Sequence, residues 1–243
     1  HLLVKQLKEK NLNNLDVTYH SYCGGFPAIP NDFKYKFSWS PVGVIKALNN
    51  DAKFVRNYEN VVETPYKNVG KYSVNNEMYE AYPNRDSTPY ISEYNFDPKW
   101  ENQEFIRGTL RLNGWKNAWV DIFKMLDNKS PELNKQIDDL GEELWKKHPY
   151  LPDEQDRVVL FVKLLALRDN KEVFNSYYWL DEKGSGENTA MGKLVSITLS
   201  CAIDLIMQNK LQSGVQAAPH EENLINYFFK TFEEYKIVIK NNL

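Results

Sequence analysis

Arginines set among turn-forming residues are the side chains of this sequence best suited to ligand binding. Arg85 lies within Tyr82–Thr88, a segment containing proline and asparagine, and the block Arg107–Arg111 follows it along the chain. A guanidinium group held in a rigid loop can bind a carboxylate through two parallel hydrogen bonds. We therefore expect an acidic small-molecule substrate, the alternative being that Arg85 forms an ion pair with Asp86.

A glycine pair ends the strand-like run that precedes these arginines. Ser21–Ala28 contains Gly24 and Gly25, and the alternating run Leu15–Tyr22 leads into it. Glycine has no Cβ, so the main chain can approach a ligand more closely there than at any other residue. We expect this end of the strand to face a ligand.

Four blocks in this order resemble saccharopine dehydrogenase of the NADP-dependent, L-glutamate-forming kind. This family, also called saccharopine reductase, occurs alone or as the second half of aminoadipate semialdehyde synthase. The blocks are Ser21–Ala28, Tyr35–Val44, Tyr82–Thr88 and Arg107–Arg111. Weaker similarity lies in Asp153–Leu160 and Thr189–Met191, and the resemblance is strongest from Ser21 to Gly114.

The resemblance implies an oxidoreductase of lysine metabolism that makes or oxidises saccharopine with NADP(H). L-saccharopine, L-glutamate and aminoadipate semialdehyde would be its ligands. The substrate-binding residues implied are Arg85, Thr109, Leu110 and Arg111, with Leu110 contributing its backbone. Those implied at the border with the cofactor are Ser21, Tyr22, Cys23, Gly24, Gly25 and Ser40. No catalytic acid or base is assigned, and Arg107 is given a structural role.

The resemblance leaves one part of the family unmatched. Its members begin with a dinucleotide-binding domain, but this sequence has no Gly-x-Gly-x-x-Gly after a strand. The nearest match, Gly184–Thr189, lacks the third glycine and is typical of a solvated loop. We expect the N-terminal Rossmann domain to be absent from this chain, so that NADP would be bound through a domain outside it.

Composition excludes several other functions. The chain has 243 residues, a net charge of −3 and a pI near 5.9, so no basic face favours nucleic acid or anionic lipid. The longest apolar run, Leu194–Met207, contains Asp204, and we interpret it as a buried helix too short and too polar to span a bilayer. Two cysteines form no disulfide framework and suit a reducing compartment, the mitochondrial matrix or the cytoplasm.

Histidine and cysteine give no sign of metal or covalent chemistry. The four histidines have no metal-ligand spacing, and we expect no metal site. Cys23 has no basic residue nearby in its motif that would lower the pKa of its thiol, so we expect a small packing residue beside the nicotinamide rather than a nucleophile.

Periodicity and capping residues predict mixed helices and strands. Expected helices cover residues 2–10, 41–50, 115–126, 131–148, 189–210 and 219–235, with Ser40 and Thr189 or Asn188 as caps. Expected strands cover residues 15–22, 53–55, 60–63 and 236–240, and residues 157–167 and 173–180 form an antiparallel pair.

The fold class expected is α/β (α+β), with a mixed sheet flanked by helices. Residues 1–114 and 150–243 would form a substrate-binding and dimerisation domain, and residues 115–149 a small helical appendage. The family implies a homodimer, or a subunit of a larger assembly.

Two hypotheses remain open. In the first, the chain is the substrate-binding part of an active dehydrogenase, which requires the cofactor domain elsewhere. In the second, it is a catalytically inactive relative that serves as a structural or assembly subunit. The intact mass of the natural protein separates them, because a cofactor domain needs a polypeptide roughly twice as large.

Overall fold

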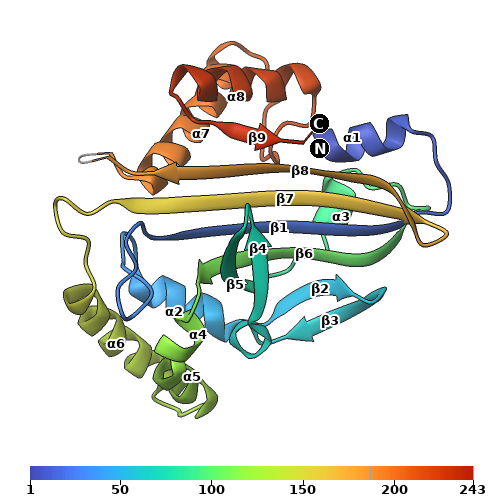
Figure 1. The fold of residues 1–243 in the computed structure, drawn as a ribbon. Coiled ribbons are helices and arrows are strands. Elements are labelled where there is room, and N and C mark those ends of the chain that lie inside the picture. The colour runs from blue at the N-terminus through green and yellow to red at the C-terminus, as the bar shows by residue number, and fades with distance from the viewer. Residues whose placement is uncertain (186–187, 243) are drawn as a thin grey trace.

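A nine-stranded mixed sheet organises the computed structural model, which describes residues 1–185 and 188–242 (Figure 1). Its strands follow the order β3-β2-β6-β1-β7-β8-β9, and β5 adds to β6 while β4 adds to β5. The strands are β1 (Asp16–Pro27), β2 (Ala52–Arg56), β3 (Glu59–Glu63), β4 (Gly70–Val74), β5 (Glu77–Pro83), β6 (Glu101–Leu112), β7 (Asp156–Arg168), β8 (Lys171–Lys183) and β9 (Ile239–Asn241).

The centre of the sheet is β1, which runs parallel to β6 and antiparallel to β7. The predicted fold class is confirmed, as is the antiparallel pair, which the structure extends into the long hairpin β7–β8. The expectation that Arg107 and Arg111 lie among turn residues is wrong, because both belong to β6 in the middle of the sheet. Gly108 and its polar neighbour Thr109 suggest a turn, so the sequence pattern does not indicate a strand there.

Helices gather at two places along the sheet. Figure 1 shows α7 and α8 beside β9 at the top of the view, and α2 with α4–α6 at the lower left. The helices are α1 (Leu2–Glu9), α2 (Pro41–Asn49), the 3-10 turn η1 (Pro65–Asn68), α3 (Tyr90–Glu93), α4 (Trp115–Ala118), α5 (Val120–Asp127), α6 (Leu133–Lys147), α7 (Ala190–Met207) and α8 (Glu222–Glu234).

Two of the predicted caps are present. The Ser40 hydroxyl accepts a hydrogen bond from Gly43 N at 3.1 Å at the start of α2. The Thr189 hydroxyl accepts one from Gly192 N at 3.0 Å at the start of α7. The helix expected over residues 115–126 divides at Trp119 into α4 and α5.

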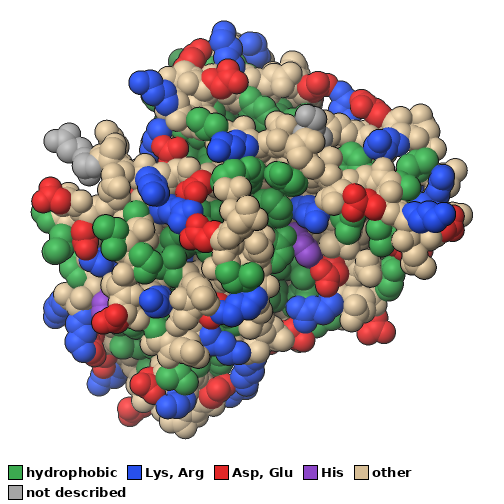
Figure 2. All heavy atoms as spheres, in the orientation of Figure 1, with side chains coloured by type: hydrophobic (Ala, Val, Ile, Leu, Met, Phe, Trp, Pro, Cys, Tyr) green, Lys and Arg blue, Asp and Glu red, His purple; other side chains and the backbone are tan. Residues whose placement is uncertain are grey.

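The two faces of the sheet carry different residues because side chains alternate along a strand. Tyr22, Phe26 and Leu110 lie on one face, in a cluster that the β4–β5 hairpin covers with Tyr79. The opposite face carries Tyr19 under α1 and Val158 under α7. Figure 2 shows acidic and basic side chains interspersed over one side of the molecule.

Helices α4–α6 form one apolar cluster with α2. Trp115 and Trp119 are fully buried in it, together with Ile45 of α2 and Leu144 of α6. Tyr82 of β5 belongs to the same cluster, so these helices contact the end of the sheet where β5 and β6 pair.

The expectation of a buried helix over Leu194–Met207 is wrong. Helix α7 is buried along one stripe only, and Val195, Leu199 and Met207 are exposed. Composition cannot show how many sides of an apolar helix have neighbours. With 18 residues at a mean hydropathy of 1.6, α7 also meets the length and composition of a membrane span, although it packs here on β7 and α8.

Candidate functional site

Several of the predicted site residues meet where β1 and β6 lie side by side. In the register of these strands Ser21 lies opposite Arg107 and Cys23 opposite Thr109. Paired residues of neighbouring strands project from the same face. Ser21, Cys23, Thr109 and Arg111 therefore share the face that α1, α3 and α7 only partly cover.

Cys23 lies on this face, accessible to solvent but recessed in a groove that Leu160 and Met191 also line. Burial by the surrounding protein raises the pKa of its thiol to about 11, although the charge of Arg111 works in the opposite direction. A thiol with so high a pKa is almost entirely protonated at neutral pH and is a poor nucleophile. This favours a packing role for Cys23 over a nucleophilic one.

Arg111 is a buried cation held by aromatic rings. The residue is 7% exposed, and its guanidinium carbon lies 4.8 Å from the ring centroid of Tyr35, 5.5 Å from that of Trp115 and 5.7 Å from that of Tyr82. Such stacking stabilises a guanidinium group and leaves its edge for hydrogen bonds.

No carboxylate of the described chain forms an ion pair with Arg111, and its Nε has no hydrogen-bond partner there. Glu80, which lies opposite it in the register of β5 and β6, instead accepts hydrogen bonds from Lys71 Nζ at 2.9 Å, Lys116 N at 2.6 Å and Gly114 N at 3.1 Å. A buried charge without a counter-ion is costly. Arg111 is thus suited to an anion supplied from outside the chain.

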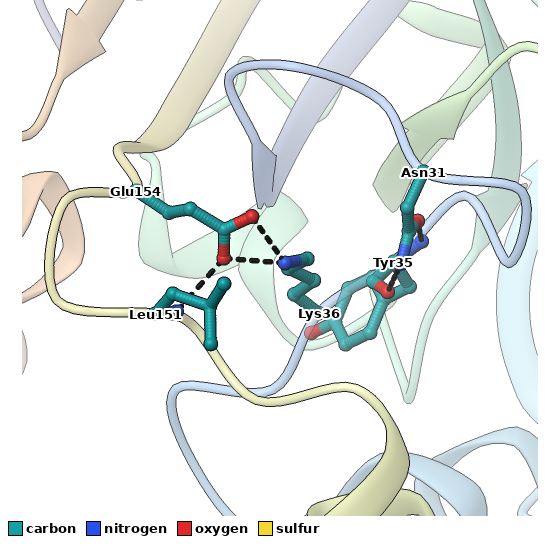
Figure 3. A network of polar contacts seen from close by, with 5 residues as sticks. All are labelled: Asn31, Tyr35, Lys36, Leu151 and Glu154. Atoms are coloured by element: carbon teal, nitrogen blue, oxygen red, sulfur yellow. Dashed lines mark hydrogen bonds and ion pairs between the residues drawn. The ribbon is translucent and has the colours of Figure 1, made fainter.

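The loop that carries Tyr35 is fixed by a polar network, drawn in Figure 3. Asn31 Nδ2 donates to Tyr35 O at 2.9 Å, and Tyr35 N donates to Asn31 Oδ1 at 3.0 Å. The next residue, Lys36, pairs with Glu154, which also accepts a hydrogen bond from Leu151 N at 2.8 Å. These contacts hold the Tyr35 ring in position beside Arg111.

Arg85 lies in the exposed loop after β5 with a left-handed backbone, φ 58°. Its carbonyl accepts from Lys53 N at 2.9 Å, and the neighbouring Asn84 N donates to Arg107 O at 3.0 Å, so the loop lies against β6. The alternative ion pair with Asp86 is not formed, because Asp86 bonds to Thr88 and pairs with Lys53 at 3.5 Å. Among the residues that the structure describes, Arg85 makes no ion pair.

Arg107 shares two features with Arg111. Its guanidinium carbon lies 3.6 Å from the ring centroid of Tyr90, and its Nε is buried without a hydrogen-bond partner in the described residues. No local sequence pattern distinguishes Arg107 from a structural arginine, because its ring partner Tyr90 lies in a separate element, the short helix α3, and reaches the strand only in the folded chain.

The structure does not bring every predicted residue to this face. Tyr22 and Leu110 are buried in the cluster under the β4–β5 hairpin, on the opposite side of the sheet. A Cβ on Gly24 would lie 2.3 Å from Leu110 O, so close packing between strands, rather than a ligand, requires this glycine. Ser40 is exposed and caps α2.

The aromatic residues around Arg111 were not among the predicted site residues. Tyr35, Tyr82 and Trp115 come from a loop, a strand and a helix separated widely in the sequence. Only the register of β5 on β6 and the packing of α4 bring them together. The solvated loop expected over Gly184–Thr189 includes residues 186 and 187, which lie outside the described residues.

Residues 1–238 match the family described as Saccharopine dehydrogenase C-terminal domain. The chain belongs to this family. It is 30% identical over 211 residues to saccharopine dehydrogenase [NADP(+), L-glutamate-forming] of Schizosaccharomyces pombe, which covers 79% of this chain and 45% of that protein. It is 36% identical over 140 residues to mitochondrial alpha-aminoadipic semialdehyde synthase of Rattus norvegicus, covering 51% of this chain and 14% of that protein.

A solved structure of the family shows the same fold. Apo saccharopine dehydrogenase (L-Glu forming) from Saccharomyces cerevisiae matches with a TM-score of 0.77 at 23% identity, over 98% of this chain and 70% of that one. The resemblance stated from the sequence is confirmed. The chain spans less than half the length of the two curated relatives.

Proposed function

We propose that this chain is the substrate-binding part of a saccharopine dehydrogenase that acts with NADP(H). The observation that carries the proposal is Arg111, a buried cation with no carboxylate partner among the described residues. Its aromatic surroundings fix the guanidinium plane, so that it can bind a substrate carboxylate through paired hydrogen bonds. L-saccharopine and L-glutamate both carry such groups.

The remaining residues of this face would orient the ligand beside Arg111. Thr109 is nearly buried on the same strand and can donate a hydroxyl hydrogen bond, while Arg85 in the exposed loop can bind a second carboxylate. Positioning of this kind lowers the barrier by holding the reacting atoms together. No residue of the chain is assigned as acid or base.

NADP would be supplied by a domain outside this chain, and its role is hydride transfer between the nicotinamide and the carbon of the imine formed from aminoadipate semialdehyde and glutamate. Only some of the residues expected to border the cofactor are placed where they could contact it. Ser21 and Cys23 face the partly uncovered side of the sheet, whereas Tyr22 and Gly24 pack against protein. A Cβ on Gly25 would lie 2.7 Å from Met191 Cε, so this glycine also packs against protein. We propose that Ser21 and Cys23 border the nicotinamide.

Assembly and location are also proposals. The family suggests a homodimer or a subunit of a larger assembly, in the mitochondrial matrix or the cytoplasm. The rat relative, whose name includes "mitochondrial", is consistent with the first of these compartments.

Spectrophotometric assay of the full-length natural polypeptide tests the proposal. We expect NADP+ to be reduced when L-saccharopine is added, and not when L-glutamate alone is added. A protein that binds neither NADPH nor saccharopine would contradict the proposal and favour the inactive subunit.

A further inference from the structure

Arg107 is a second arginine of β6 that has no carboxylate partner among the described residues. Its guanidinium carbon lies 3.6 Å from the ring centroid of Tyr90, and its buried Nε has no hydrogen-bond partner there. The acids of the adjoining backbone are engaged elsewhere, since Asp86 pairs with a lysine of β2 and Glu104 with a histidine of β1. A half-buried cation in this state is suited to an anion from outside the chain.

The segment that follows β5 holds this arginine in place. Tyr90 stacks on the guanidinium group, and the hydroxyl of Tyr94 lies close to it. Burial raises the pKa of Tyr94, and the charge of Arg107 works in the opposite direction. The backbone N of Arg107 donates a hydrogen bond to Ser87 Oγ at 3.0 Å. The loop that carries Arg85 therefore lies beside Arg107, at one end of the face described above.

The regular register of β6 sets the spacing between its two unpaired arginines. Arg107, Thr109 and Arg111 project from the same face, because side chains alternate along the strand and no bulge interrupts its pairing there. A strand rises about 3.3 Å per residue, so Arg107 and Arg111 are separated by about 13 Å. Thr109 lies halfway between them and opposite Cys23 in the register.

This spacing matches the length of saccharopine. The molecule joins aminoadipate and glutamate through one nitrogen, and it carries one carboxylate on the first half and two on the second. Its longest path between carboxyl carbons has roughly ten bonds and spans about 12 Å when extended. The carbon that gives up the hydride lies halfway along this path, as Thr109 lies halfway between the two arginines.

We propose that Arg107, together with Arg85, binds the two carboxylates of the glutamate half of saccharopine, while Arg111 binds the single carboxylate of the other half. The inference rests on the proposed function, which supplies this ligand and places the nicotinamide beside Cys23. The spacing along β6 then selects substrates by length, because a ligand that reaches both ends presents its central carbon to the nicotinamide. L-glutamate, with about 5 Å between its carboxyl carbons, reaches only one end.

Isothermal titration of the full-length natural polypeptide with L-saccharopine and with L-glutamate tests this assignment. In the Arg107→Met variant we expect both affinities to fall about tenfold or more, because hydrogen bonds to charged groups are lost. In the Arg111→Met variant only the affinity for L-saccharopine should fall. The Arg56→Met control should change neither, because Arg56 stacks on Phe54 but pairs with Glu63.

The outcomes separate this inference from the proposed function. Unchanged saccharopine affinity in Arg107→Met, with weakened binding in Arg111→Met, overturns the role of Arg107 and leaves the proposed function intact. A glutamate affinity that falls in Arg111→Met and not in Arg107→Met also overturns the assignment. Saccharopine affinity that is unchanged in both variants contradicts the proposed function as well.

Affinity for NADPH, measured in parallel, distinguishes a lost ligand contact from a lost fold. We expect it to be unchanged in Arg107→Met. If that variant fails to fold, Arg107→Lys decides, because lysine keeps the charge but not the paired donors of the guanidinium group. Weakened saccharopine binding by Arg107→Lys supports the proposal, and an affinity equal to that of the unaltered protein overturns it.

Discussion

The guanidinium carbon of Arg111 lies 4.8 Å from the ring centroid of Tyr35, a residue 76 positions earlier in the chain (111 − 35). The nearest carboxylate in the strand register, Glu80, is bonded to Lys71 and two backbone amides instead. The fold thus keeps Arg111 charged, oriented and available. This relationship supports the proposed role in binding an anionic substrate.

Glu80 is expected to couple the stability of the fold to pH. Burial disfavours its charged form, but the hydrogen bonds from Lys116 N, Lys71 and Gly114 N outweigh this and lower its pKa. A lowered pKa in the folded state means that the stabilisation is present above the ordinary glutamate pKa, about 4.3, and is lost as pH falls through the folded value.

The Glu80→Gln variant should therefore unfold about 1–3 kcal/mol more easily at pH 7, since bonds to a charged group are lost. Urea unfolding at pH 7 and at pH 4 measures this. We expect the difference from the unaltered protein to shrink at the lower pH, and a difference that grows on acidification would refute the assignment.

Gly24 is expected to tolerate no side chain. A Cβ there would lie 2.3 Å from Leu110 O, a backbone atom of the adjoining strand, so β1 and β6 would have to separate. We predict that Gly24→Ala destabilises the protein by about 1–3 kcal/mol or more. Gly70→Ala in β4 is the matched control, since nothing lies within 4 Å of its added Cβ. Equal melting temperatures for the two variants would show that the contact with Leu110 O does not prevent a side chain at position 24.

Asp156 is expected to hold the start of α7. Its carboxylate is buried and accepts from Ala190 N at 2.6 Å and from Met191 N at 2.9 Å, two amides that lack partners within the helix. Asp156→Ala should cost about 2 kcal/mol, more than the roughly 1 kcal/mol expected for the exposed cap in Thr189→Ala. Chemical denaturation would rank the two, and the reverse order would contradict this role.

Local sequence patterns predicted the elements that can be identified without knowing which residues pack against them in the fold. The hairpin β7–β8 follows from two runs of strand-forming residues around a short polar turn, and Ser40 and Thr189 mark helix starts. Strand β6 was missed because Gly108 and its polar neighbours suggest a turn. The burial of α7 was misjudged because an apolar composition cannot distinguish a core helix from one with an uncovered side.

The prediction of the site residues depended on the family resemblance more than on local sequence patterns. Arg111 was found through the similarity of its block to a family, whereas the rings of Tyr35, Tyr82 and Trp115 become its neighbours only through tertiary packing. The alternation of side chains on β1 and β6 then separates Cys23 and Thr109 from Tyr22 and Leu110. A linear motif contains no information about that separation until the register is known.

Isothermal titration of L-saccharopine into the full-length polypeptide and its Arg111→Met variant tests the central claim most directly. Losing hydrogen bonds to a charged group should cost about 1.5–3 kcal/mol, a weakening of roughly ten- to 150-fold. Arg56→Met is the control, because Arg56 stacks on Phe54 at 4.7 Å but pairs with Glu63 at 3.4 Å. We predict weakened binding for Arg111→Met alone of these two; equal saccharopine affinity in the unaltered and Arg111→Met proteins would contradict the account.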